Sequence, residues 1–363
     1  MNQAGAVTVE RLDELIQQEA DAFFRLRPEW SLTTGPKDIE LIAHALRVVL
    51  HLGPDAVDAH ADDFLVLADI QRPDGGWSNV EDVVEYPKGR VWASAFAALM
   101  LIRGNEHLRH ARLARAVERA IDYFLATQEG DGRWLDPPTW TDLDATSHPV
   151  SFFNVVRAFG KTYRMEAVAQ AWEKGLKFVL DRQAEDGGWY VSDFVSLSDV
   201  VASGSPIEMT AHLAQDALVA DLVLEHRLDV RDACARAVAR LVAWQGLDGS
   251  WDRGNTDHTM DAVRSLMLVA KVLEDETAQP ASAVQPVIER AMAWIVAVKN
   301  DVGWGNFPGD RTNVERLCDG LDTLLKYRAY GNEDSAELIG LWGYRPSPAL
   351  TLRSFREERA CRR

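Results

Sequence analysis

The chain has 363 residues, 47% of them hydrophobic, and a formal net charge of −17 at pH 7. Such a chain can bury a large core, whereas its acidic balance argues against a nucleic-acid partner, because phosphate binding needs clustered lysine and arginine. Its three cysteines form no paired motif, no basic and apolar leader begins the chain, and no apolar stretch is long enough to cross a bilayer. We therefore expect a cytoplasmic protein without a transmembrane segment.

Helical periodicity begins near the N-terminus, and one plan then repeats along the chain. Apolar residues at three- and four-residue steps predict helices over 8–26 and 37–52. Five further units follow, each with a half-polar leading helix, a turn, a polar loop and a more apolar closing helix. The leading helices are predicted at 57–70, 110–127, 165–182, 230–244 and 283–297. The closing helices are predicted at 91–103, 146–161, 207–225, 258–274 and 313–329.

One turn motif, Gln-x-x-Asp-Gly-x-Trp, separates the two helices of each unit. Well-formed copies end at Trp77, Trp134, Trp189 and Trp251, and a worn copy ends at Trp304. The spacing of about 55 residues is typical of a repeat architecture. Glycine after aspartate permits a tight turn, the polar side chains can bond free helix ends, and tryptophan can fill the gap between repeats. The motif is therefore predicted to be structural, and its aspartates are not candidates for catalysis.

Six leading and six closing helices can stack openly or close into a ring. The leading helices are polar on one face, whereas several closing helices are poor in charge around most of their circumference. This contrast favours an inner ring of helices covered by an outer one. The sequence thus predicts an all-α fold, an (α/α)6 toroid of six helical hairpins. We expect a single toroid domain over 1–345 and a C-terminal tail over 346–363.

The turn copies resemble the QW motif of the squalene-hopene cyclase and prenyltransferase superfamily, over about residues 57–330. The resemblance implies an α/α toroid and, for many members, an apolar cavity that holds a polyprenyl chain. It does not determine the reaction, because function depends on the residues of the site rather than on the fold.

The segment from Asp142 to Thr146 resembles the Asp-x-Asp-Asp-Thr motif of class II terpenoid cyclases. Asp142 matches the first position, Asp144 the aspartate that protonates the substrate in that family, and Thr146 the threonine, while Ala145 replaces the last aspartate. Protonating an alkene requires a carboxylic acid kept protonated in a pocket without water, and a nearby carboxylate helps to keep it so. His148, one helical turn after Asp144, can hydrogen-bond the acid. The predicted catalytic residues are Asp144, Asp142 and His148.

The starts of the other closing helices should converge on the same mouth of the ring, where aromatic faces would stabilise a carbocation. The predicted substrate-binding residues are Trp92, Trp140, Thr146, Phe152, Glu208, His212, Asp257, His258, Asp261 and Asp319. The polar members also fit helix caps or a solvated surface, and Trp92 fits a core position. Asp144 and Thr146 likewise fit a helix cap as well as a catalytic site.

Three functions remain open on these residues. The first is a class II-type terpenoid cyclase that protonates a linear isoprenoid, a small-molecule substrate, with Asp144. The second is a carbohydrate enzyme in which Asp144 acts with Glu208 or Asp257, because two carboxylates flank the bond in glycoside hydrolysis. The third is a non-catalytic toroid that binds an apolar ligand or a protein partner. An apolar, tryptophan-walled pocket would support cyclisation, and an open polar cleft would support sugar chemistry.

A zinc site of the protein prenyltransferase kind is not expected. In that branch of the superfamily the ligands include an Asp-x-Cys pair and a later histidine. Here Leu321 stands where the cysteine would follow Asp319, and no histidine occurs after His258. We expect no metal site and no required cofactor, and Mg²⁺ would enter only with a substrate that carries a diphosphate.

Overall fold

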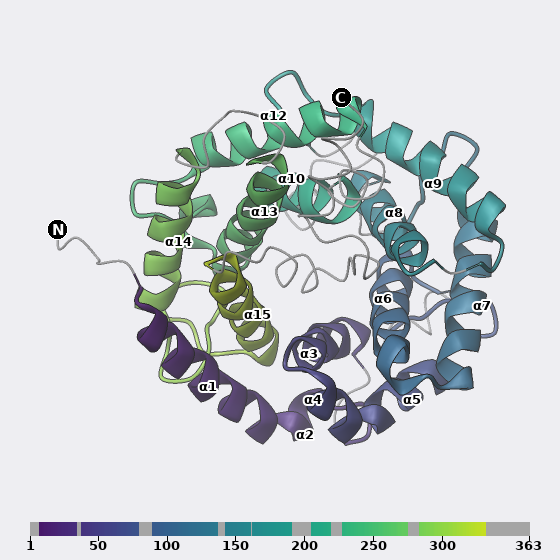
Figure 1. Ribbon diagram of the computed structural model, residues 1–363, viewed down its shortest axis with the longest axis horizontal. Helices are drawn as coiled ribbons and strands as arrows, with labels where there is room; N and C mark the ends of the chain where they lie inside the picture. Colours follow the sequence, from purple (N-terminus) through teal and green to yellow (C-terminus); the bar gives the residue numbers. More distant parts are fainter. Residues whose placement is uncertain are drawn as a thin grey trace, which may run out of the picture.

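The computed structural model describes residues 7–34, 38–79, 89–136, 142–160, 162–190, 205–218, 227–274 and 283–331. Their helices form two concentric rings (Figure 1). The outer ring contains α1 (Val9–Arg25), α5 (Ala61–Asp69), α7 (Ala111–Thr127), α9 (Met165–Leu180), α12 (Leu228–Trp244) and α14 (Gln285–Ala297). The inner ring contains α3 (Ile39–His51), α6 (Val91–Leu108), α8 (Asp142–Ala158), α10 (Pro206–His212) with the π-helical η2 (Leu213–Leu218), α13 (Thr256–Glu274) and α15 (Val314–Tyr330). The predicted all-α toroid is confirmed.

Three short helices complete the described part of the chain. They are α2 (Arg27–Trp30), α4 (Pro54–Ala59) and the 3-10 helix η3 (Asp252–Gly254). The predicted helix over 57–70 is divided at His60, where α4 ends and α5 begins. No described helix combines the length and the apolar character that a bilayer span requires. The predicted boundary between the domain and the tail, at 345 and 346, lies outside the described residues.

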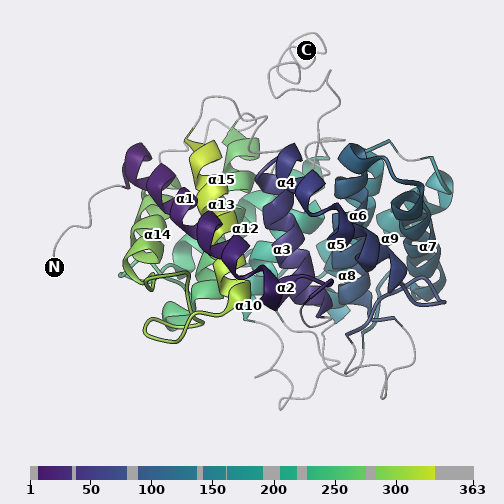
Figure 2. The ribbon, with the colours of Figure 1, turned by 90° about the horizontal axis from the view of Figure 1, so that it is seen from below.

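The ring closes because the first hairpin packs against the last. Figure 2 shows α1 beside α14 and α15, and Figure 1 shows α3 beside α15. Glu19 on α1 is fully buried in this seam, where one carboxylate oxygen accepts a hydrogen bond from Gly303 N at 2.8 Å. The other oxygen lies 2.7 Å from Lys299 Nζ. Both partners belong to the segment between α14 and α15, so these contacts join the two ends of the repeat array into a closed ring rather than an open superhelix.

The turn motif links consecutive hairpins, as the sequence predicts. Gln128 Nε2 donates to Gly132 O within its own turn at 2.9 Å and to Ala171 O on the next outer helix at 2.8 Å. Gln71, Gln183 and Gln245 make the same pair of bonds in their copies. Gly132 has a φ of 98°, and a Cβ there would lie 2.4 Å from Lys174 O. Only glycine therefore permits the close approach of the turn to that helix.

Helix α8 starts four residues earlier than predicted. The structure places Asp142 and Asp144 in the first turn of α8, whereas the sequence analysis placed both in the preceding loop. Acidic side chains are favourable at a helix N-terminus, which accounts for the earlier start. Thr146 consequently lies in the second turn, where Thr146 Oγ1 accepts a hydrogen bond from Trp134 N at 3.0 Å. Ser94, Thr210 and Thr259 receive the corresponding tryptophan N–H in the other copies.

Candidate active site

The inner helices surround a central cavity of about 1100 Å³, a volume that includes its opening to solvent. Every inner helix except α15 contributes residues at steps of four and three, the spacing that keeps side chains on one helix face. On α3 these residues are Glu40, His44 and Arg47. The other lining residues are Phe96, Leu99, Met100, Arg103, Asp144, His148, Ser151, Val155, Glu208, His212, Gln215, Asp257, Asp261, Arg264, Glu315 and Lys326. Apart from Phe96, Leu99, Met100 and Val155 they are polar, so the described wall differs from the apolar cavity that the resemblance implied.

The charges of the wall are ordered along the ring axis. His44 Nδ1 lies 2.9 Å from Asp319 Oδ1, and Arg47 one turn later reaches both Asp319 and Asp322, so α3 and α15 run parallel. The first lining residue of five inner helices is a carboxylate: Glu40, Asp144, Glu208, Asp257 and Glu315. Cationic side chains lie further along the helices: Arg47, Arg103, Arg264 and Lys326. Acids near helix N-termini and bases nearer C-termini both suit the helix dipole.

Two carboxylates on α13 have opposite electrostatic environments. Burial raises the pKa of Asp257 to about 7; the nearby Arg316 opposes this rise, while Asp261 and Asp319 add to it. For Asp261, burial alone would raise the pKa, but His212 and Arg264 outweigh it and hold the pKa well below its usual range. Close to neutral pH, Asp257 therefore carries a proton part of the time, whereas Asp261 is ionised.

Asp144 faces the cavity from the first turn of α8. Its Oδ1 lies 3.7 Å from His148 Nε2, one turn later, and both side chains line the wall. The His148 ring meets the Phe96 ring edge to face, with the ring centroids 4.9 Å apart. The structure thus brings together Asp144, His148 and an aromatic side chain from α6.

Other predicted site residues lie behind the wall rather than in it. Asp142 is buried, and its Oδ2 is 3.4 Å from Arg133 Nη1. Phe152 is fully buried between α8 and α7, with its ring centroid 5.3 Å from that of Phe124. Trp92 is almost fully buried, and its ring lies against Phe96 at 6.0 Å. Trp140 lies outside the described residues.

Asp319 lies at the centre of a buried ion network behind the wall. It has no exposed surface, and its oxygens accept hydrogen bonds from Arg47 at 2.7 Å, Arg316 at 2.6 Å and Arg264 at 3.2 Å. Burial alone would raise the pKa of Asp319, but His44 and Arg316 outweigh it and hold the pKa well below its usual range. Asp319 thereby anchors α3, α13 and α15 to one another, a structural position that sequence analysis did not separate from a binding one.

The remaining predicted residues form a second polar group at α10 and α13. His212 Nε2 lies 3.1 Å from Asp261 Oδ2, and His258 Nε2 lies 3.1 Å from Glu208 Oε2. Burial alone would lower the pKa of His258, but Glu208 outweighs it and raises the pKa to about 9, with Asp257 adding to the effect. His258 is therefore a cation that neutralises Glu208 at neutral pH.

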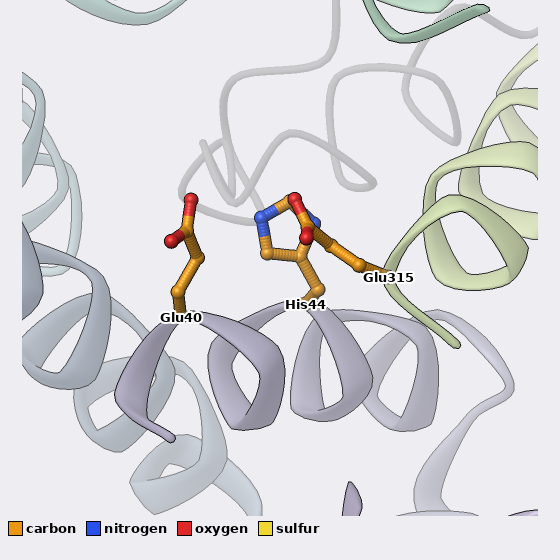
Figure 3. Close-up of side chains that lie close together, drawn as sticks. All are labelled: Glu40, His44 and Glu315. Carbon is orange, nitrogen blue, oxygen red and sulfur yellow. The ribbon is translucent and has the colours of Figure 1, made fainter. Parts of the chain in front are cut away.

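Two groups of side chains bring metal-ligating atoms within 4.8 Å of one another. One contains Glu40, His44 and Glu315, and the other contains Glu208, His212 and Asp261. Figure 3 shows the Glu40 carboxylate beside the His44 ring and the Glu315 side chain reaching the ring from α15, its carboxylate overlapping the ring in this view. Sequence analysis missed the first group, although Glu40, His44, Arg47 and His51 form a polar stripe at helical steps on α3.

Comparisons with known proteins match the fold but give no sequence family. No family model matches the chain, and no curated protein matches it. A type II terpene cyclase from Scytonema, solved with its substrate geranylgeranyl dihydroxybenzoate, is 14% identical with a TM-score of 0.60, over 89% of this chain and 99% of that one. A glycosyl hydrolase of family 88 from Bacteroides vulgatus is 12% identical with a TM-score of 0.57, over 89% and 99%.

The chain has the α/α-toroid fold. An ent-copalyl diphosphate synthase from Streptomyces platensis also matches, at 18% identity and a TM-score of 0.53, over 77% of this chain and 50% of that one. The chain thus spans half the length of that synthase but nearly the whole of the Scytonema cyclase and of the hydrolase. The three neighbours named here have different activities and are at most 18% identical to this chain, so the likeness shows the fold, and the reaction depends on the residues of the site.

Proposed function

We propose that the protein is an enzyme that performs acid–base chemistry on a carbohydrate, or on a similarly hydroxyl-rich small molecule, in the central cavity. The observation that carries the proposal is the composition of the cavity wall, in which four of the nineteen described lining residues are apolar. Sugar hydroxyl groups need many hydrogen-bond donors and acceptors, and charged side chains make the strongest of these bonds. The described wall supplies such groups from every inner helix.

The described residues of the cavity wall are poorly suited to a carbocation intermediate. A cyclising isoprenoid needs apolar and aromatic surfaces that exclude water. Carboxylates in the wall would capture the cation or remove a proton from it before the rings were complete. A wall of charged side chains also retains water, since charged groups are costly to dehydrate. This is why the carbohydrate function ranks ahead of cyclisation.

Asp257 is the proposed general acid. Its pKa of about 7 makes it protonated for part of the time at neutral pH, which suits a group that must donate a proton to a leaving oxygen. The second carboxylate of the proposed pair is Asp144, which faces the same cavity from α8. Two carboxylates in different environments are the usual equipment for cleaving a glycosidic bond.

The test uses the full chain and a panel of neutral, uronate-containing and unsaturated oligosaccharides, with products measured by mass spectrometry. We expect turnover of at least one class. Asp257→Asn should lower kcat by about 10²-fold or more, because it removes general acid catalysis. A wild-type protein that turns over none of the panel, or an Asp257→Asn variant with full activity, contradicts the proposal.

A second candidate function is protonation-initiated cyclisation with Asp144 as the acid. It is supported by the cavity-facing Asp144 and His148 pair at the position of the resembling motif, and by the single-toroid extent of the Scytonema cyclase. In this mechanism Asp144 would protonate an alkene and the Phe96 ring would face the cation.

The two candidates predict different sensitive residues. Incubation with linear polyprenols and polyprenyl diphosphates, with and without Mg²⁺, tests cyclisation by gas chromatography of the extracted products. If cyclisation is the function, Asp144→Asn abolishes product and Asp257→Asn leaves much of it. If the substrate is a sugar, no cyclic hydrocarbon forms with any of these compounds.

A further inference from the structure

We propose that Glu40, His44 and Glu315 bind a divalent transition-metal cation, of the Mn²⁺ or Zn²⁺ class, at the seam between the first and last hairpins. The inference goes beyond the proposed function and does not depend on it. Glu40 and His44 lie one turn apart on α3, and Glu315 lies at the start of α15. The three residues therefore meet only because the ring is closed.

The geometry of the three side chains suits a metal ion. Their ligand atoms all lie within 4.8 Å of one another. Ligands bound at about 2.0–2.2 Å from a metal lie about 3 Å from their neighbours, so modest side-chain rotation closes the site. One imidazole and two carboxylates form a mixed nitrogen and oxygen set that suits first-row divalent cations. All three residues line the cavity, so further coordination positions would be open to a small molecule there.

The hydrogen bond of His44 prepares its ring for this role. His44 Nδ1 lies 2.9 Å from Asp319 Oδ1, and Arg47 Nη2 lies 2.7 Å from the same oxygen. With Nδ1–H donating to Asp319, the lone pair for a metal is on Nε2. Figure 3 shows one ring nitrogen on the side of Glu40 and the other on the side of Glu315. A carboxylate bonded to the far nitrogen of a histidine is the usual support of a metal-binding imidazole.

The site also has negative charge that its neighbours leave uncompensated. Within the described part of the chain, no hydrogen bond or ion pair holds the Glu40 carboxylate. Arg316 does bond to Glu315, but it also contacts Asp257 and Asp319. Oxygens of the Glu40 and Glu315 carboxylates lie within 4.8 Å of one another, and a bound cation would offset their repulsion.

The other three-residue group is the natural control. Glu208, His212 and Asp261 offer the same kinds of ligand atom in the same cavity. Their charges are already paired, since Glu208 lies beside His258 and Asp261 beside Arg264. We therefore expect the metal at Glu40, His44 and Glu315 rather than there.

The experiment titrates the full chain with Mn²⁺ and separately with Zn²⁺ by isothermal calorimetry at pH 7.5, in two buffers of different ionisation enthalpy. We expect one site, and the two buffers separate the heat of metal binding from any heat of proton exchange. Glu40→Gln and Glu315→Gln should each weaken binding at least tenfold, whereas the matched Glu208→Gln leaves it within about twofold. Other charged side chains that face Glu40 and His44 are unchanged in every variant; they are Asp38, Arg47, Arg316 and Asp319.

Folding is checked by circular dichroism and thermal unfolding of each metal-free variant. Glu40→Gln removes a repelling charge, so its metal-free Tm should be no lower than that of the wild type. The wild type should gain Tm with Mn²⁺ or Zn²⁺, and Glu40→Gln should not. Absence of binding by the wild type at millimolar metal, or loss of binding in Glu208→Gln but not in Glu40→Gln, overturns the proposal.

Discussion

At the scale of single residues, carboxylates that line the same cavity have shifts of their pKa values in opposite directions. Asp257 and Asp261 are one helical turn apart, yet the pKa of the first is raised and that of the second is lowered. Both carboxylates contact a cation, but Asp257 has only Arg316, whereas Asp261 has both His212 and Arg264. Such separation of pKa values is typical of acid–base sites.

The raised pKa of Asp257 predicts a pH-dependent stability. An acid whose pKa rises from about 4 in the unfolded chain to about 7 in the folded one costs no stability below pH 4 and destabilises progressively as pH rises to 7. Asp257→Asn cannot ionise, so it should be more stable than the wild type by about 4 kcal/mol at pH 8 and equal to it at pH 4. Thermal unfolding of both proteins between pH 4 and 8 measures the difference. A difference that does not change with pH contradicts the assignment.

At the scale of elements, the turns and the inner helices are joined by a repeated hydroxyl contact. Thr146, Thr210 and Thr259 each accept the backbone N–H of the tryptophan that ends the preceding turn, and Ser94 does so in the first copy. This contact sets the register of each inner helix against its turn. It therefore determines which helix face is presented to the cavity.

Thr146 is consequently predicted to act on stability rather than on substrate binding. Thr146→Val keeps the shape of the side chain but leaves the buried Trp134 N–H without its acceptor, which should cost about 1–3 kcal/mol in the free energy of unfolding. Urea denaturation measures it. Thr127→Val is the matched control, because the Thr127 hydroxyl bonds Tyr123 O at the partly exposed end of α7, and its loss should cost under about 0.5 kcal/mol. Equal losses of unfolding free energy in the two variants would show that the Thr146 contact contributes no more to stability than the Thr127 contact does.

At the scale of the whole molecule, function depends on closure of the ring. The cavity wall combines α3 with α15, which are separated by most of the chain, and the buried network around Asp319 connects them. A toroid that opened at this seam would expose that network to water and separate Glu40 from Glu315. Closure is therefore a condition for every site proposed above.

Glu19 is predicted to be the residue on which closure depends most. Glu19→Gln leaves the largely buried Lys299 ammonium without its counter-charge, and breaking a buried pair costs about 3–5 kcal/mol. Glu14→Gln on the same helix is the control, because Glu14 is exposed and its pair with Arg11 should contribute under about 1 kcal/mol. Denaturant unfolding measures both variants. Similar stability of Glu19→Gln and Glu14→Gln would mean that the seam is held elsewhere.

Much of the architecture could be predicted because it is encoded locally. The glutamine, glycine and tryptophan of each turn act within a few residues or on the adjacent hairpin, and helical periodicity is a property of short windows. The same reasoning placed Asp144, His148, Glu208, His212, Asp257 and Asp261 at the starts of closing helices, and the structure brings these six into one wall.

The sequence by itself determined the repeat, the two kinds of helix and the acidic starts of the inner helices. Only the tertiary structure decided that Glu40, His44 and Glu315 meet, that Asp319 lies behind the wall, and that most described residues lining the cavity are polar or charged. The physical reason is distance along the chain: His44 and Asp319 are 275 residues apart, and their contact depends on the summed curvature of every hairpin between them. No short stretch of sequence shows that summed curvature, whereas the residues of each turn show the geometry of that turn.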